Sequence, residues 1–411
     1  MNLSIQRSLK LLIDEYHNFL KQYSFRNKAI DGVLAHFKEF RSYCFISATP
    51  IPEVLKPTIF NGIPEHIADW NEVDDITIYP YHTDKPYMIA AQFIKVYQTK
   101  GFLNVNGKES KEAYFFINSV REIKDILKQT QLTEDDYRII CADNDKNRMT
   151  LKGYTISSST DTSKKFNFIT SKSFEGVDFH SESGICFVVS NVQNRHTLVS
   201  IDMDIPQIAG RIRTKTNPFR NKIVHIFNTK PTDHYTTYEE MEHTIQDEIK
   251  AAQERADLLN SSNLSESAIK QQVSEIHKIG NESYLSYQDG KFVVNDMIGK
   301  LQLYSFLITN VVYNSDKSLR DTYEQNKMIV TKGKWHIAPE RFVKDLIKEP
   351  TFRDLHKRYC EIMKNPMTFN LETIEIEHKY PILGRAYRKV GIQELKRLRT
   401  IKSIKLALGE I

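Results

Sequence analysis

The stretch AYFFINSVREIKDILKQT, residues 113–130, places an apolar run with strand character directly before a predicted helix at residues 120–130. The same alternation extends over residues 85–230. Further strands are expected at YRIICAD, FNFITS, ICFVVS and KIVHIF, and further helices at residues 87–98 and around 205–213. Four or five buried strands with helical crossovers predict a doubly wound α/β domain built on a parallel sheet.

The first 84 residues predict part of a second sheet of the same kind. LKLLID (residues 9–14) and SYCFIS (residues 42–47) have the character of buried strands, and residues 17–40 between them are expected to be mostly helical. TPIPEVLKP (residues 49–57) breaks this alternation, and a loose segment follows. We therefore expect a domain boundary near residue 84, with domains at 1–84 and 85–230.

Residues 231–411 predict a mostly helical domain. Apolar residues recur at three- and four-residue spacing from Met241 to Leu259, and packing within the chain's own helical domain is favoured over a partner helix. YLSYQDGKFVV carries Asp289-Gly290 between two alternating runs, which is typical of a β-hairpin. The fold class expected for the whole chain is α/β, followed by helices.

Composition narrows the class of protein. The 411 residues are 40% hydrophobic and 27% charged, which argues against a disordered or collagen-like chain. No apolar run approaches the ~20 residues of a membrane span, and the N-terminus lacks a signal-peptide layout. We expect an intracellular (cytoplasmic) protein without a membrane partner. The four cysteines are far apart, so they are interpreted as core residues and not as zinc ligands or disulfides.

The segment LLIDEYHNF (residues 11–19) ends a predicted strand in two carboxylates. Nucleotide hydrolases place carboxylates at such a sheet edge, where Asp14 would hold Mg²⁺ and Glu15 would activate the attacking water. An acidic cap on a surface helix is the alternative.

In FISATP (residues 45–50), Ser47 and Thr49 are hydroxyl residues that would hydrogen-bond toward the segment containing His17. A strand ending at a proline is the alternative there.

Two further segments carry candidate ligands for phosphate. FITSKSFEGVDF (residues 168–179) brings Thr170 and Ser171 to a strand tip, followed by Gly176 and Asp178. An ordinary β-α loop is the alternative. PQIAGRIRT (residues 206–214) offers Gln207, Arg211 and Arg213. The two arginines would stabilise phosphate charge in a transition state, unless they are solvated surface charges.

In this order and spacing the segments resemble the superfamily 2 helicases and translocases, the DEAD/DEAH-box-like ATPases. DEYH is similar to motif II, SAT to motif III, YFFINSVREIKDIL (residues 114–127) to motif IV, TSKSFEGVD to motif V and QIAGRIR to motif VI. The resemblance covers residues 9–229. Motif VI has a compact form similar to that of viral and phage helicases, whereas FEGVDF is similar to the iron–sulfur branch, whose cluster cysteines are absent from this sequence.

The resemblance implies two RecA-like domains that hold ATP and Mg²⁺ between them and carry single-stranded or partly duplex DNA, with RNA as the alternative. It implies a role in replication or repair, of phage or mobile-element type. By the same correspondence Asp14 and Glu15 handle metal and water, and His17, Ser47 and Thr49 couple hydrolysis to movement. Thr170 and Ser171 would contact the nucleic acid, Gly176 and Asp178 the nucleotide, and Gln207, Arg211 and Arg213 would complete the catalytic site.

One motif of these ATPases is missing. The Walker A loop, G-x-x-x-x-G-K-[ST], should precede motif II, and the sequence contains none. Asn106-Gly107-Lys108 is its nearest imitation, and we reject it because it follows motif III. We expect residues 1–84 to be the second half of a RecA-like domain whose Walker A segment lies upstream or on a separate polypeptide. The chain alone would then be inactive and would expose apolar strand surface. The alternative is a non-hydrolysing nucleic-acid-binding or scaffold protein.

The C-terminal end is basic. Residues 379–405 contain nine Lys or Arg residues and one acidic residue, Glu394. Apolar residues recur in this segment from Ile392 to Ile404. The apolar face would seat these helices on a core, leaving Arg397, Arg399 and Lys402 to neutralise phosphates. A solvated basic helix is the equal alternative.

Overall fold

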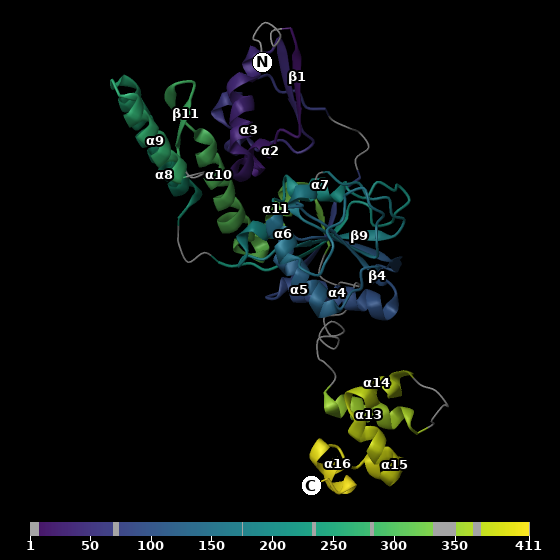
Figure 1. Ribbon diagram of the computed structural model, residues 1–411. Coiled ribbons are helices and arrows are strands. Elements are labelled where there is room, and N and C mark those ends of the chain that lie inside the picture. Colours follow the sequence, from purple (N-terminus) through teal and green to yellow (C-terminus); the bar gives the residue numbers. More distant parts are fainter. Residues whose placement is uncertain are drawn as a thin grey trace. The chain divides into compact units, whose positions relative to one another are not determined.

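The computed structural model describes residues 8–68, 74–174, 176–231, 236–279, 283–331, 351–364 and 371–410. The chain divides into two compact units, Met1–Ile337 and Ala338–Ile411. Figure 1 shows both in sequence colours. Among the described residues, no helix has both the length and the hydropathy that crossing a membrane requires.

A seven-stranded, all-parallel sheet forms the centre of the first unit. Its strand order is β13-β3-β10-β9-β6-β8-β7. The strands are β3 (Thr77–His82), β6 (Glu112–Phe116), β7 (Tyr137–Ile140), β8 (Phe166–Ile169), β9 (Gly184–Val189), β10 (Lys222–Phe227) and β13 (Ile329–Val330). The inner strands β6, β8 and β9 and the edge strand β7 are buried on both faces, as the continuous apolar runs predict. The α/β class is thereby established.

Helices cover both faces of this sheet. Helices α4 (Pro86–Lys100) and α5 (Val120–Thr130) lie on one face, and α7 (Asp204–Ala209) and α11 (Asp316–Gln325) on the other, as Figure 1 shows. The short α6 (Asp145–Thr150) follows β7. On the α7 face, Tyr313, Leu319 and Tyr323 share a core with residues of β6, β9 and α7.

Two strands of this sheet differ from the sequence expectation. β3 lies within the segment we expected to be loose, and it pairs with β10, so the sheet begins before residue 84. β13 follows the helices after residue 230 and pairs with β3. Pairing between strands so distant in sequence has no local signal, because it depends on long-range contacts.

The segment Asn106-Gly107 is the turn of a hairpin between β4 (Leu103–Val105) and β5 (Lys108–Ser110). Both turn residues have positive φ, +52° and +82°, which suits the tight turn of a two-residue hairpin. This imitation of a phosphate loop is therefore a structural turn.

The N-terminal strands β1 (Lys10–Asp14) and β2 (Ser42–Ile46) form a separate parallel pair. Helices α2 (Asn18–Lys21) and α3 (Tyr23–His36) connect them. The face bearing Ile13 and Phe45 packs on a core, whereas Leu12 is 65% and Ile46 42% exposed on the other face. The predicted exposure of apolar strand surface is confirmed, whereas the prediction that both strands are buried is wrong for one of their two faces. Cys44 is also exposed, unlike the other three cysteines, which are buried as expected.

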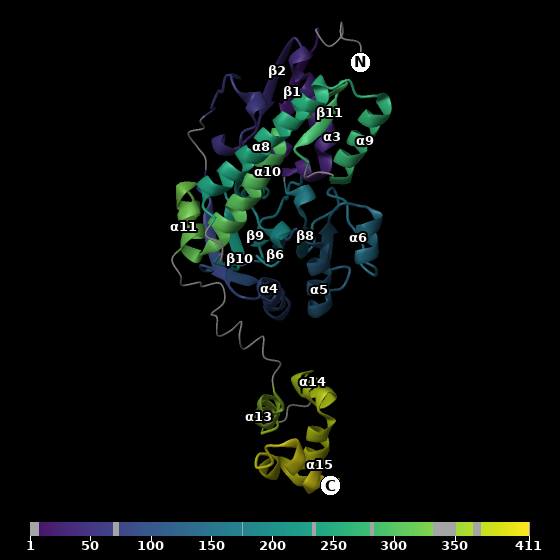
Figure 2. The same ribbon diagram turned by 90° about the vertical axis from the view of Figure 1, so that its left-hand side faces the viewer.

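A helical layer adjoins this two-stranded sheet. It contains α8 (Tyr238–Ser261), α9 (Glu266–Ile279) and α10 (Asp296–Phe306), together with the predicted hairpin β11 (Leu285–Gln288) and β12 (Lys291–Val294). Asp289 and Gly290 both have positive φ, as the hairpin turn requires. Figure 2 shows α8 and α10 running beside β1 and α3. Ile245, Met297 and Ile298 of this layer share a core with Phe19 and Leu20 of α2.

The second unit is helical. It comprises α13 (Phe352–Ile362), α14 (Leu371–Lys379), α15 (Pro381–Leu395) and α16 (Ile401–Leu408). Its core includes Tyr359, Leu383, Leu395 and Ile404. The residues after 230, which we expected to form one domain, thus contribute to both units.

Candidate functional site

The two carboxylates of DEYH lie where β1 ends. Asp14 is exposed, and its Oδ1 accepts a hydrogen bond of 2.9 Å from the backbone N–H of Glu15. Glu15 has a φ of +53°, an uncommon conformation for a residue with a side chain. Asp14 pairs in register with Ile46, so the residues after β2 lie beside Glu15. The SAT segment therefore adjoins DEYH because parallel strands end at the same sheet edge.

The Glu15 carboxylate contacts two of the predicted coupling residues. Ser47 Oγ donates to Glu15 Oε2 at 3.4 Å, and His17 Nδ1 lies 3.2 Å from the same oxygen. His17 is completely buried, with its Nδ1 2.7 Å from Ser47 Oγ. A carboxylate only accepts hydrogen bonds, so these contacts are best satisfied when Nδ1 carries the imidazole proton. The backbone N–H of Thr49 donates to Ser47 Oγ at 3.0 Å.

Gln207 reaches this cluster from the seven-stranded-sheet part of the unit. Its Nε2 donates to Glu15 Oε2 at 3.3 Å and to Thr49 Oγ1 at 3.2 Å. Gln207 is 4% and Thr49 5% exposed, so the contact between them is shielded from water, whereas the Glu15 side chain is 32% exposed. Residues of three separate sequence segments thereby form one hydrogen-bonded cluster.

The two predicted arginines share one carboxylate. Arg213 Nε donates to Asp178 Oδ1 at 2.8 Å, and Arg211 Nη1 lies 3.5 Å from the same oxygen. Arg211 also donates from Nε to the Gln207 carbonyl at 2.8 Å and from Nη2 to Gln207 Oε1 at 3.3 Å. Arg211 is buried and Arg213 is half-exposed. The guanidinium of Arg211 thus links Asp178 to the Glu15 cluster.

The helix expected around residues 205–213 ends at Ala209, so the prediction is wrong for its last turn. Ile212 instead forms a parallel bridge with Phe179, in which the Phe179 N–H donates to the Arg211 carbonyl at 2.8 Å and the Arg213 N–H to the Phe179 carbonyl at 2.9 Å. This extended pairing brings both arginines beside Asp178.

The remaining residues of FITSKSFEGVDF have different surroundings. Thr170 is 6% exposed, and its hydroxyl donates to the carbonyl of Ile140 at 3.4 Å. Ser171 Oγ donates to Asn118 Oδ1 at 2.6 Å on the surface. A Cβ added to Gly176 would meet no atom within 4 Å, so this position faces open space. Of the two hydroxyls, only that of Ser171 lies at the surface.

Three contacts near the predicted motifs have no signal in the sequence. Asn118, at the end of the motif IV-like strand, holds Ser171 and donates to the His196 carbonyl at 2.6 Å. Lys21 of α2 forms an ion pair of 2.6 Å with Asp204, the first residue of α7. Asn118 lies within the motif IV-like segment and Lys21 shortly after DEYH, but their partners are distant in sequence, so only the fold reveals these contacts.

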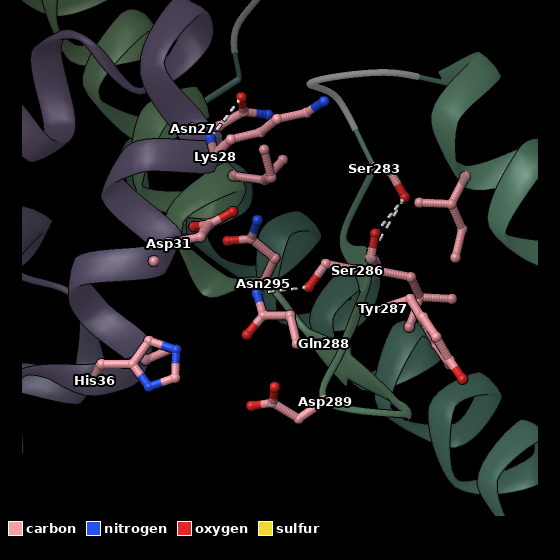
Figure 3. Close-up of a pocket in the computed structure, with 15 residues that line it drawn as sticks. Asn27, Lys28, Asp31, His36, Ser283, Ser286, Tyr287, Gln288, Asp289 and Asn295 are labelled. Atoms are coloured by element: carbon pink, nitrogen blue, oxygen red, sulfur yellow. Dashed lines mark hydrogen bonds between the residues drawn. The ribbon is translucent and has the colours of Figure 1, made fainter. Parts of the chain in front are cut away.

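A groove of about 700 Å³ lies elsewhere in the first unit, between α3 and the β11–β12 hairpin. Figure 3 shows Asp31 and Asn295 facing one another across it. The buried Tyr23 hydroxyl donates to Asp31 at 2.7 Å and accepts from Asn295 Nδ2, and burial raises the pKa of Asp31. Lys28 and His36 line the groove together with the carboxylates of Asp31 and Asp289. Such mixed charge is not a surface suited to a run of phosphates.

In the second unit the basic residues differ in their ion pairing. Arg397 lies 3.3 Å from Glu394, whereas Arg399 and Lys402 are exposed and no described carboxylate lies within ion-pair distance of either. Leu395 and Ile404 are buried, as the predicted apolar face requires, but Ile401 is 40% exposed, contrary to that expectation. Ile401 lies in the first turn of α16, beside Lys402.

No family model matches this sequence, and no curated protein matches it either.

Proposed function

We propose that this chain is part of an ATP-dependent nucleic-acid helicase or translocase of superfamily 2, with DNA as the preferred substrate. The observation that carries the proposal is the convergence of Glu15, Thr49, Gln207 and Arg211 in one hydrogen-bonded cluster. These residues come from three segments that resemble motifs II, III and VI. Such convergence supports a RecA-like assignment for both parallel sheets.

In this proposal Glu15 is the general base. Its side chain is 32% exposed, so one side remains open to a water molecule while Ser47 and Gln207 orient the carboxylate. Arg211 and Arg213 would exchange part of their contact with Asp178 for phosphate oxygens and stabilise charge in the transition state.

The residues present fit a magnesium ion. The described residues contain no group of three or more His, Cys, Asp or Glu side chains able to hold a metal. Magnesium in nucleotide sites needs only one or two carboxylates, because phosphates and water supply the other ligands. The exposed Asp14 is the residue that would hold it. When bound, the ion would supply charge neutralisation for the triphosphate.

The lysine and backbone amides of a Walker A loop are absent from the 411 residues. We therefore expect hydrolysis only when a Walker A segment is supplied, in the same or another polypeptide. This absence also favours a second candidate, a non-hydrolysing nucleic-acid-binding or scaffold protein. For either candidate, Arg399, which lies between α15 and α16, and Lys402 of α16 are the proposed contacts to phosphates.

ATP hydrolysis distinguishes the two candidates. We would measure it for this chain with and without single-stranded DNA, and for a version extended to any upstream Walker A sequence. DNA-stimulated hydrolysis by the extended version would support the motor. Inactivity of both forms with retained DNA binding would support the scaffold, and absence of DNA binding would contradict both.

A further inference from the structure

An ion pair joins α2 to α7 beside the Glu15 cluster. Lys21 Nζ lies 2.6 Å from Asp204 Oδ1, and the side chains are only 14% and 8% exposed. Neither residue belongs to the segments that carry the resemblance or the proposed chemistry. The pair connects the two parts of the first unit that contribute Glu15 and Gln207.

Both partners are one helical turn from a residue of the cluster. The backbone N–H of Lys21 donates to the carbonyl of His17 at 3.3 Å, so Lys21 follows the buried imidazole by one turn. Asp204 precedes Gln207 by three residues in α7, and residues at this spacing lie on the same helix face. The Lys21–Asp204 and Glu15–Gln207 contacts therefore lie side by side, and both connect residues 15–21 to α7.

Asp204 also fixes the start of α7. Its Oδ2 accepts a hydrogen bond of 2.7 Å from the backbone N–H of Ser200. One carboxylate thus anchors the helix to its own loop through one oxygen and to α2 through the other. A buried charge that loses its partner is strongly unfavourable, so removal of either member should separate the two segments.

We propose that Lys21 and Asp204 are positioning residues: their ion pair holds α7 against α2 and so keeps the Gln207 carboxamide on the Glu15 carboxylate. The positional role depends only on the contacts described. Its consequence for ATP hydrolysis rests on the proposed function.

The positional role is tested by hydrogen exchange of the full chain without nucleotide. Lys21→Met and Asp204→Asn each remove the charge with little change in size, and Lys21→Arg retains it. We expect both neutral variants to raise exchange about tenfold at both α2 and α7, because the opening of one segment frees the other. Lys21→Arg should restore protection at both helices. Unchanged exchange at α7 in Lys21→Met would overturn the proposal.

Lys56→Met is the matched control. It removes a lysine whose partners, Glu53 and Glu65, belong to its own N-terminal part of the chain, so protection at α7 should persist. If Lys56→Met frees α7 as Lys21→Met does, the effect is general destabilisation and the proposal fails.

Hydrolysis by the chain supplied with a Walker A segment provides the second test. Displacement of Gln207 should lower kcat at least about tenfold in Lys21→Met while KM for ATP changes less than about threefold. Lys21→Arg should recover kcat. If the parent form does not hydrolyse ATP, the proposed function fails and hydrogen exchange alone decides the positional role; an active parent with an unchanged kcat in Lys21→Met would refute the catalytic consequence.

Discussion

The side-chain amide of Gln207 donates a 3.3 Å hydrogen bond to the carboxylate of Glu15, which lies 192 residues earlier in the chain. The same amide donates to Thr49. Because an amide N–H and a carboxylate are complementary at this distance, the contact holds the residue that follows β1 against α7. The hydrogen bond should therefore be lost if the Gln207 amide is replaced by a charged group.

Gln207→Glu should destabilise the fold, because it replaces the donating amide by a second carboxylate. We expect a loss of about 1–2 kcal/mol in the free energy of unfolding at neutral pH. The paired carboxyls would have raised pKa values, so the loss should shrink as the pH falls through those values and one of the groups is protonated. Chemical denaturation at pH 7.5 and pH 4 measures this. Gln207→Met tests the missing hydrogen bond alone, and an equal, pH-independent loss in both variants would contradict the charge argument.

Glu15→Gln should strongly lower kcat for hydrolysis in the form of the chain supplied with a Walker A segment. Loss of a general base costs roughly 10²- to 10⁴-fold in kcat. The glutamine retains the size of the side chain, so ATP binding should change little. Single-turnover hydrolysis and nucleotide titration separate these effects. Glu39→Gln, which alters a glutamate paired with His36, is the control and should leave kcat unchanged. A similar loss of kcat in this variant would show that the effect is not specific to Glu15.

Leu12→Lys should reduce self-association of the purified chain. Leu12 and Ile46 expose apolar surface on one face of the β1–β2 pair, and the outer edges of both strands are unpaired among the described residues. Such a face and such edges favour association between copies. Sedimentation velocity over a range of concentrations measures the effect. Ile67→Lys alters a 90% exposed residue outside this sheet and should leave association as it was. Equal behaviour of the two variants would show that the face has no special role.

The stability of the first unit should fall as the pH is lowered from about 6.5. His225 is completely buried, its ring lies within hydrogen-bond distance of Tyr323 and Ser190, and burial lowers its pKa to about 3. The unfolded chain binds a proton at His225 near pH 6.5, but the folded chain does not until about pH 3. His225 therefore does not change the free energy of unfolding above pH 6.5. Below pH 6.5 it lowers the free energy of unfolding by up to about 1.4 kcal/mol for each pH unit.

His225→Gln tests that pH dependence. The variant should be less stable than the parent at pH 7.5, because Tyr323 and Ser190 lose good partners, but its stability should fall less steeply between pH 6.5 and 4.5. Urea denaturation across this range measures both slopes. Parallel slopes would show that His225 is not responsible.

Charge reversal of Arg399 and Lys402 should weaken binding of single-stranded DNA and flatten its dependence on salt. For every phosphate that the variant no longer neutralises, the slope of log K against log [salt] should become shallower by about 0.7. Arg397 is held by Glu394, so adding Arg397→Glu should change the slope less than either of the other two. Fluorescence anisotropy of the full chain at several salt concentrations measures this. Lys317→Glu with Arg320→Glu, two exposed residues of α11, provides a control of equal charge. An unchanged slope in the Arg399 and Lys402 variant would exclude these two residues from the interface.

The amino-acid sequence by itself determined the elements whose signals are local. The apolar runs of β6 to β10, the helix at Val120–Thr130 and the Asp289-Gly290 hairpin each depend on residues within one short window, and the structure has them where they were predicted. The residues of DEYH, SAT and QIAGRIR were also found as candidates from their types and order alone. The sequence indicates the types of side chain in the cluster but not the contacts between them.

Only the tertiary structure decided which distant groups meet. β3 and β13 join the sheet because their backbone groups pair across large sequence separations, and Arg213 reaches Asp178 because α7 ends at Ala209 and Ile212 bridges to Phe179. Lys21 and Asp204 are ordinary helix residues in sequence, and they become a largely buried ion pair when α2 lies beside α7. A carboxylate and an ammonium attract one another strongly only when the fold removes them from water, and that removal is a property of packing, which no local stretch of sequence encodes.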